Sequence, residues 1–262
     1  MSFRAKSLPI SITTLVAIVS LISAICTAAQ PPESVSVPEV AVGESWVYAA
    51  YQDKQKLTVK VEIWQLSDKE IHAVVTQNGD SAITQLQVFD RQWNQIETIR
   101  GGTRLIKFSP YLPSFHFPMR IGKAWARDYE WQRSDLPESK SSPKTWAENQ
   151  ARKPGGERKE GSAQAQGRVL GWEEITVPAG TYTAMKVELK SPSYAGPETL
   201  RIFGKKELFG GVLETYWYVP TVKRFVKYEA WHYINDKLVG SHGLDLIEYN
   251  EVLVTPAAVP NR

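Results

Sequence analysis

The stretch from Val212 to Tyr249 decides the predicted fold. It reads VLETYWYVP (212–220), TVKRFVKYEAWHYI (221–234), ND (235–236) and KLVGSHGLDLIEY (237–249). Aromatic and β-branched residues crowd the first two runs, and Pro220 and Asn235-Asp236 bound them. Runs of this composition between turn residues are typical of antiparallel strands joined by tight turns. The stretch therefore predicts successive antiparallel strands.

Alternating apolar and polar residues extend this prediction to the rest of the chain. Lys56 to Gln65 places Val and Ile on one side and Thr, Lys and Glu on the other, and Thr181 to Leu189 alternates similarly. Ile83 to Phe89 alternates again, with Leu86 and Val88 expected inside. Such alternation is typical of a sheet with one buried and one wet face. We therefore predict an all-β fold, in which a curved antiparallel sheet forms a partly open barrel or a sandwich.

Composition divides the chain into one β domain with flanking segments. We expect a signal peptide over residues 1–29, an extended leader over 30–41, the β domain over 42–249 and a flexible tail over 250–262. Within the domain, Gln132 to Gln166 holds seven basic and five acidic residues but few apolar ones. It cannot bury enough surface to offset the cost of ordering, so we predict a mobile polar insertion. Leu105 to Phe117 contains Pro110 and Pro113 and is predicted to be a loop that packs on the sheet.

The first residues have the pattern of an export signal. Arg4 and Lys6 precede a mostly apolar, uncharged run from Leu8 to Ile25, and small residues follow at Thr27-Ala28-Ala29. This order is typical of a secretory signal peptide, with cleavage expected after Ala29. The alternative is a retained membrane anchor, since the apolar run has about the minimum length for a span. We predict a periplasmic or secreted protein with no membrane span once the signal is removed.

The single cysteine, Cys26, bears on both anchoring and redox chemistry. Bacterial lipoprotein signals place a small residue directly before the modified cysteine, whereas here that residue is the bulky Ile25. We therefore do not expect lipid anchoring at Cys26. Cleavage after Ala29 would leave no cysteine in the mature protein, and hence no disulfide.

Charge and motifs narrow the function classes. The chain has 31 basic and 28 acidic residues, and removing Arg4 and Lys6 leaves 29 basic residues. This balance does not indicate nucleic-acid binding. The four histidines lack metal-ligand spacing and no glycine-rich phosphate loop occurs, so we expect no metal and no cofactor. His242 lies near Ser241 and Asp245, but a catalytic triad is recognised by geometry, and no Gly-x-Ser-x-Gly elbow occurs. No residue is assigned a catalytic role, and whether the protein is an enzyme stays open.

Two segments resemble a known group of proteins. Trp172 to Glu188 contains Val-Pro-Ala-Gly-Thr at 177–181, and Thr215 to Glu229 contains Tyr-Trp-Tyr-x-Pro at 216–220. Together with Gly-x-x-Trp-x-Tyr at 43–48, these signatures resemble bacterial exported proteins and lipoproteins classed as domains of unknown function, some labelled TapB-like. The resemblance covers most of residues 42–249 outside the insertion. It implies a β-rich protein of the bacterial envelope, and it brings no agreed activity and no catalytic residues.

Aromatic residues on both faces of one predicted strand indicate where a ligand would bind. Tyr216 and Tyr218 face one way and Trp217 the other, and Trp231 lies in the next run. Such strands suit a curved sheet that packs on one side and lines a cavity on the other. The alternative is a thick aromatic core without a cavity. We predict that these four residues bind a lipid, or another apolar or amphiphilic ligand, on the concave face.

Two other functions stay open. A protein-interaction or assembly module of the cell envelope would use the exposed aromatic edge and the charged insertion. A hydrolase acting on envelope polymers would need a polar cluster in a cleft. Lys223, Arg224 and Lys227 beside the aromatic run suit either a surface for sugars or polyanions, or cross-strand and cation–π contacts that stabilise the sheet.

Overall fold

The computed structural model describes residues 30–52, 55–77, 80–134, 160–192, 210–234 and 236–252. In these residues the backbone forms twelve strands and one short 3-10 helix, η1. The elements are β1 (Ser45–Gln52), β2 (Gln55–Leu66), β3 (Glu70–Gln77), β4 (Asp80–Asp90), β5 (Gln95–Arg100), β6 (Thr103–Leu112), β7 (Ala124–Arg133), β8 (Glu160–Val177), β9 (Gly180–Pro192), β10 (Gly210–Val219), η1 (Pro220–Val222), β11 (Arg224–Ile234) and β12 (Lys237–Asn250).

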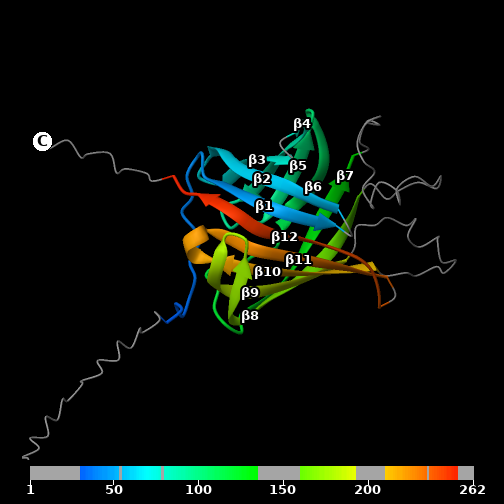
Figure 1. Ribbon diagram of the computed structural model, residues 1–262. Helices are drawn as coiled ribbons and strands as arrows, with labels where there is room; N and C mark the ends of the chain where they lie inside the picture. The colour runs from blue at the N-terminus through cyan, green and yellow to red at the C-terminus, as the bar shows by residue number, and fades with distance from the viewer. Residues whose placement is uncertain are drawn as a thin grey trace, which may run out of the picture. The chain divides into compact units, whose positions relative to one another are not determined.

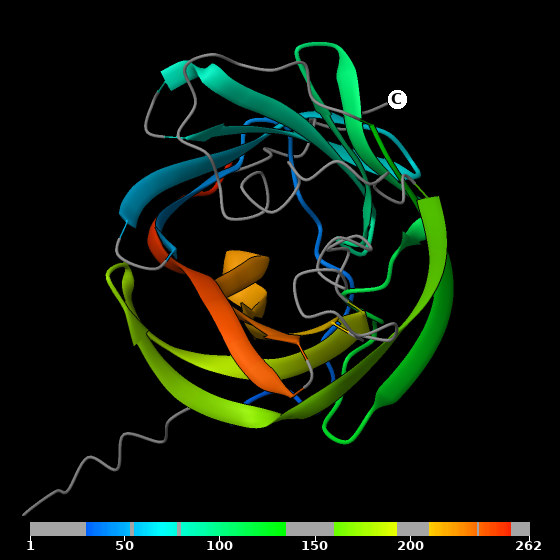
Figure 2. The ribbon, with the colours of Figure 1, turned by 90° about the vertical axis from the view of Figure 1, so that its right-hand side faces the viewer.

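The described strands close into one antiparallel barrel. Each strand pairs with its neighbours along the chain, and β1 also pairs with β12, from Ser45 opposite Asn250 to Gln52 opposite His242. Figure 1 shows the strands side by side, and Figure 2 looks into the ring that they form. The predicted curved, antiparallel, all-β fold is confirmed, and the sheet closes completely. Closure removes the unpaired edge strands that an open sheet has to protect.

The predicted segments do not all match the strands that the structure shows. β7 continues through Arg133 and β8 begins at Glu160, so both ends of the predicted insertion lie in strands. Its middle, residues 135–159, lies outside the described residues, as do the predicted signal peptide and residues 253–262 of the predicted tail. The prediction of a loop over Leu105–Phe117 is wrong as far as Leu112, where β6 ends, and holds for residues 113–117, whose Phe115 and Phe117 are buried. β6 tolerates Pro110 since that residue is outside the paired positions of both neighbouring ladders, where its missing N–H is not needed.

The inward face of the barrel carries the core. Trp46 and Tyr48 on β1 pair with Val61 and Val59 on β2, and both aromatic side chains are fully buried. On the other side of the barrel, Met185, Val187 and Leu189 of β9 are also fully buried. The apolar faces predicted for Lys56–Gln65 and Thr181–Leu189 therefore point inward. Burial of one such side chain contributes about 1.5–3 kcal/mol.

On β4 the predicted faces are reversed. Gln87 and Phe89 line an interior cavity, so Leu86 and Val88 point outward. Val88 is nevertheless only 3% exposed. Its cross-strand partners on the outer face are His72 on β3 and Glu97 on β5, and their longer side chains flank it. On this strand an apolar valine lies outside, covered by polar neighbours, and a polar glutamine lies inside. Hydrophobicity alone therefore assigns the wrong face of the strand to the interior.

Two tryptophans of β7 lie over glycines of β8. A Cβ built on Gly161 would meet the Trp131 indole at 3.1 Å, and one on Gly167 would lie 2.6 Å from Nε1 of Trp125 and closer still to its ring carbons. Both indoles are less than a tenth exposed. A bulky aromatic ring therefore occupies the space that a side chain on β8 would fill, which explains why glycine is present within this long strand.

One end of the barrel is held by hydrogen bonds to the η1 segment, the orange coil in Figure 2. Trp46 Nε1 donates to the Val222 carbonyl at 2.9 Å, and Trp93 Nε1 donates to the Lys223 carbonyl at 3.0 Å. Lys223 has a left-handed backbone, with φ of 60°, and its ammonium group lies 2.6 Å from the fully buried Glu44 carboxylate. These contacts fix the start of β11 and with it the next residue, Arg224.

Candidate functional site

A cavity of about 200 Å³ lies inside the barrel. Its lining comes from β4, β5, β6, β10, β11, β12 and the connections after β4 and β6. The apolar and aromatic part of the lining includes Phe89, Trp93, Leu112, Phe115, Phe225 and Leu244. The polar and hydroxyl-bearing part includes Gln87, Gln95, Glu214, Tyr216, Arg224 and Tyr228. The cavity thus combines an aromatic wall with a few polar groups, which is the usual composition of small-molecule sites.

The connection after β6 supplies Phe115, and a polar turn holds it in place. Asp90 accepts hydrogen bonds from the backbone N–H groups of Gln92 and Asn94, each at 2.8 Å. The Asn94 side-chain oxygen then accepts the Phe115 N–H at 2.8 Å. The Phe115 ring lies edge-on to Tyr216, with 5.0 Å between centroids, and to Tyr218, with 5.8 Å. Asp90 therefore positions Phe115, and with it one wall of the cavity, through its hydrogen bond to Asn94.

Arg224, the first residue of β11, is the cation of the cavity. Its guanidinium lies 4.6–6.0 Å from the ring centroids of five aromatic residues, namely Trp46, Tyr48, Phe89, Trp93 and Phe225. The residue is 7% exposed, and its Nε and Nη1 atoms have no hydrogen-bond partner in the described part of the chain. Burial lowers the pKa of Arg224, yet a guanidinium stays protonated at neutral pH. A buried positive charge, with two donor nitrogens that have no partner among the described residues, therefore faces the cavity.

Glu214 on β10 is the acidic group of the cavity. Its Oε1 atom accepts hydrogen bonds from the hydroxyls of Tyr228 at 2.7 Å and Tyr216 at 3.0 Å. Burial raises the pKa of Glu214, and the two hydroxyl hydrogen bonds oppose that rise. Burial and the neighbouring carboxylate also raise the pKa of both tyrosines, so their hydroxyls stay protonated and donate. This carboxylate already has partners, in contrast to the guanidinium.

Two histidines lie on the same inner surface as Glu214. His232 Nε2 and His242 Nδ1 are 3.1 Å apart, and the His242 ring is 5.7 Å from the Tyr228 ring. Burial lowers the pKa of both imidazoles, and the repulsion by His232 lowers that of His242 further, to about 4. Ser241 and Asp245 alternate with His242 along β12 and point outward, with Asp245 3.8 Å from Lys227. A Ser241–His242–Asp245 triad is therefore excluded by geometry.

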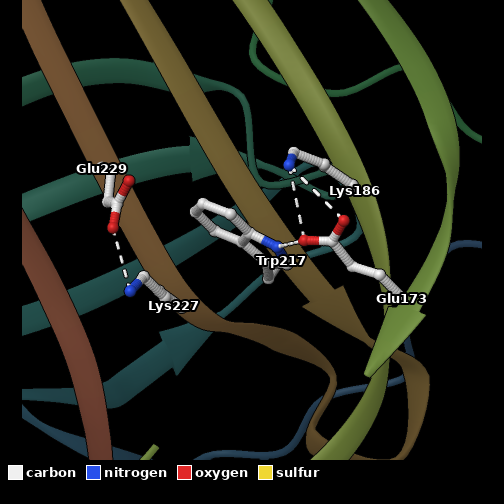
Figure 3. Close-up of polar contacts among 5 residues, drawn as sticks. All are labelled: Glu173, Lys186, Trp217, Lys227 and Glu229. Atoms are coloured by element: carbon white, nitrogen blue, oxygen red, sulfur yellow. Dashed lines mark hydrogen bonds and ion pairs between the residues drawn. The ribbon is translucent and has the colours of Figure 1, made fainter. Parts of the chain in front are cut away.

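The structure separates the four predicted ligand-binding residues. Tyr216 and Tyr218 line the cavity. Trp217 lies on the opposite face of β10. Trp231 of β11 shares that outer face, since it pairs with Leu213, which lies four residues from Trp217 and on the same face of β10. Figure 3 shows the surroundings of Trp217 on this outer face. The prediction of aromatic residues on both faces of β10 is confirmed, and the inner pair adjoins a cavity.

The outer cluster around Trp217 is a set of cross-strand pairs. Its indole N–H donates to the Glu173 carboxylate of β8, and the ammonium groups of Lys186 and Lys227 lie 5.0 and 5.5 Å from its ring centroid. Lys227 also binds Glu229 at 2.9 Å (Figure 3). These contacts leave Trp217 only 6% exposed. Each polar group shown has a partner, so the cluster stabilises the barrel wall.

Glu173→Gln tests this structural interpretation. The amide oxygen can still accept the Trp217 indole N–H, and the Lys186 ion pair that is lost is partly exposed. We therefore expect the free energy of unfolding to fall by less than about 1 kcal/mol. Urea denaturation measures it. A loss of ligand binding in this variant would contradict the assignment of the cluster to the wall.

Sequence reasoning missed the two charged residues of the cavity. The sequence offered either a basic surface with Lys223 and Lys227 or cation–π contacts for Arg224, and the structure shows cation–π contacts, but neither interpretation placed the residue in a cavity. Arg224 follows a residue with a left-handed backbone, which turns its side chain inward. No local sequence pattern predicts this direction. Glu214 could have been found, because it shares the alternation phase of Tyr216 and Tyr218.

The fold and the site together define an antiparallel β-barrel with an aromatic cavity that holds a buried cation. No protein-family model matches the chain, and no curated protein matches it. Within the described residues, no helix has the length and apolar character needed to cross a membrane. In the same part of the chain, no three or more His, Cys, Asp or Glu side chains are placed to hold a metal ion.

Three solved structures are similar to the chain at low identity. A protein from Bacteroides fragilis, described as exported and with a YmcC-like fold, is 13% identical, with coverage of 83% of this chain and 100% of that one, and a TM-score of 0.42. The hypothetical lipoprotein YmcC from Escherichia coli is 11% identical, with 80% and 87% coverage and a TM-score of 0.42. A proposed lipoprotein from Parabacteroides distasonis is 15% identical, with 84% and 100% coverage and a TM-score of 0.37. At these values no property is transferred, and the TapB-like resemblance stays a prediction.

Proposed function

We propose that this chain is an exported, non-enzymatic protein that binds a small apolar or amphiphilic molecule inside its barrel. The proposal of export rests on the basic, apolar and small-residue order of residues 1–29. The proposal of binding rests on one observation: the 200 Å³ cavity with an aromatic wall and a polar group at Arg224.

The size of the cavity sets the size of the ligand. Apolar cavities of about 150 Å³ already bind benzene, and drug-sized ligands occupy about 300–1,000 Å³. A cavity of 200 Å³ therefore suits a molecule with on the order of ten non-hydrogen atoms. A whole diacyl lipid is too large for this space, so the ligand, or the part of it that enters the cavity, is a single short chain or a small aromatic group.

The lining favours a molecule with one polar end. Phe115 and Phe225 offer ring surface, while Gln87, Glu214 and Arg224 offer hydrogen-bonding groups in the same cavity. An unpaired buried charge destabilises the folded protein by several kcal/mol, and a polar ligand group beside it would remove part of that cost. A purely structural core would be expected to pair or exclude this charge. The observation therefore favours binding over a plain aromatic core.

A cavity-filling variant tests this function. The probes are three eight-carbon compounds, octan-1-ol, octanoate and octylamine, and the readout is the melting temperature together with calorimetric titration. At least one probe should bind the wild-type protein, and at a concentration of about 100 times its Kd it should stabilise the fold by about 2.7 kcal/mol. Leu244→Trp, which places an indole in the cavity, should abolish that binding.

The matched control lies on the same strand. Leu238→Trp changes the same residue type on β12 at a side chain that is 56% exposed, so binding should be unchanged. Gln95→Trp, on the opposite wall of the cavity, replaces Leu244→Trp if that variant does not fold. The proposed function fails if none of the three probes binds, or if both cavity-filling variants bind them as the wild type does.

A further inference from the structure

We infer that the polar group of the ligand is an anion and that the Arg224 guanidinium binds it. The inference rests on the proposed function and names the chemical class of its ligand: a small organic acid with a short apolar tail, held by its carboxylate. Three features of the cavity carry it, namely the unused donors of Arg224, the partners of Glu214 and the arrangement of the aromatic rings.

The first feature is the hydrogen-bonding state of Arg224. A guanidinium carries five N–H donors in a planar fork that matches a carboxylate. The five rings around Arg224 interact with its charge, but the Nε and Nη1 donors have no acceptor in the described part of the chain. Buried donors of this kind are rare in folded proteins and call for a partner. The side chain is 7% exposed and lines the cavity, so a molecule in the cavity can reach it.

The second feature is the separation of the two charges in the cavity. No carboxylate of the described residues lies within ion-pair distance of Arg224, whereas Lys223 beside it binds both Glu44, at 2.6 Å, and Glu251, at 3.1 Å. Glu214 lies in the same lining but accepts its hydrogen bonds from Tyr216 and Tyr228. The described residues therefore supply counter-ions for Lys223 and none for Arg224, which leaves the position of an anion to the ligand.

The third feature is the apolar surface next to the guanidinium. Phe89, Trp93 and Phe225 contact Arg224 and also line the cavity. A tail that leaves the carboxylate would therefore run directly onto aromatic surface. A cationic head would meet the guanidinium with like charge, and a neutral head would accept fewer hydrogen bonds from it. The order of affinity should be carboxylate, then alcohol, then amine.

Calorimetric titration of the folded protein with the three eight-carbon probes tests this order. Octanoate should bind the wild type at least about tenfold more tightly than octan-1-ol, and octylamine should bind most weakly. Arg224→Met keeps an unbranched side chain as far as the position of Nε and removes the charge and donors. It should abolish the preference for octanoate while leaving octan-1-ol binding within about threefold of the wild type.

The control is an arginine outside the cavity. Arg104 on β6 is largely exposed and pairs with Glu97 at 2.6 Å, so Arg104→Met should keep the full preference for octanoate. If Arg224→Met does not fold, the order of the three probes on the wild type still decides. Octan-1-ol binding as tightly as octanoate would overturn the inference and leave the proposed function standing. Binding of none of the probes would overturn both.

Discussion

Gly167→Ala should lower the free energy of unfolding by about 2–4 kcal/mol, because it forces a methyl group into a ring. The new Cβ would lie 2.6 Å from Nε1 of Trp125 and closer to its Cε2 and Cζ2 atoms. The ring cannot easily move away, since it is 8% exposed and its N–H donates to the Pro113 carbonyl at 3.0 Å. Relief of the clash would therefore break a buried hydrogen bond or bend the β7–β8 pair. Chemical denaturation measures the loss.

A glycine on the same strand provides the control. A Cβ on Gly171 would meet no atom within 4 Å, so Gly171→Ala should change the stability by no more than about 0.5 kcal/mol. A second test removes the ring: in a Trp125→Leu background, Gly167→Ala should cost at least about 1 kcal/mol less than in the wild type, which a double-mutant cycle detects. Equal losses of stability for the two glycine variants would show that the Trp125 indole is not the reason that position 167 requires glycine.

Acidification from pH 6.5 to pH 4 should destabilise the barrel by about 3 kcal/mol through His242. Burial and the neighbouring His232 lower the pKa of His242 from its ordinary value of 6.5 to about 4. Between these values the unfolded chain binds a proton at this residue and the folded protein does not. Stability from this residue is therefore complete above pH 6.5, falls as the pH decreases through the window, and changes no further below about pH 4.

The variant His242→Gln isolates this effect from the other groups that face it. Those groups are His232, Tyr228 and Glu214, and the raised pKa of Glu214 acts in the opposite direction. The difference in unfolding free energy between wild type and variant should be constant from pH 6.5 to 8 and should shrink by about 3 kcal/mol as the pH falls to 4. Denaturant titrations at several pH values give this difference. A difference that stays constant over the whole range would mean that folding does not lower the pKa of the His242 imidazole.

The strand content of this chain was predictable because side-chain alternation is a local property. Thr181–Leu189 shows it plainly, and the residues Met185, Val187 and Leu189 are all fully buried. Alternation failed on β4, where an outward Val88 is covered by its neighbours and an inward Gln87 lines the cavity. A period of two shows that two faces exist, but hydrophobicity identifies the inner face only when the interior is apolar. In this barrel part of the interior is polar.

The candidate site was predictable only in part, for a similar reason. The phase of Tyr216 and Tyr218 on β10 is set by adjacent residues, and both tyrosines do line the cavity. The environment of Arg224 comes from β1, β4, the turn after β4 and β11, whose residues are up to 178 positions away in the chain. No local pattern contains that information. It arises when β1 pairs with β12 and the ring closes.

Local sequence patterns are enough to predict the strands, the antiparallel sheet and the aromatic character of β10, because these depend on neighbours two or three residues apart. The closure of the sheet, the inner face of β4 and a guanidinium that faces a cavity with no counter-ion among the described residues emerge only in the folded barrel. These features depend on contacts between distant strands, where the cost of burying a charge is set by whatever groups the fold places around it.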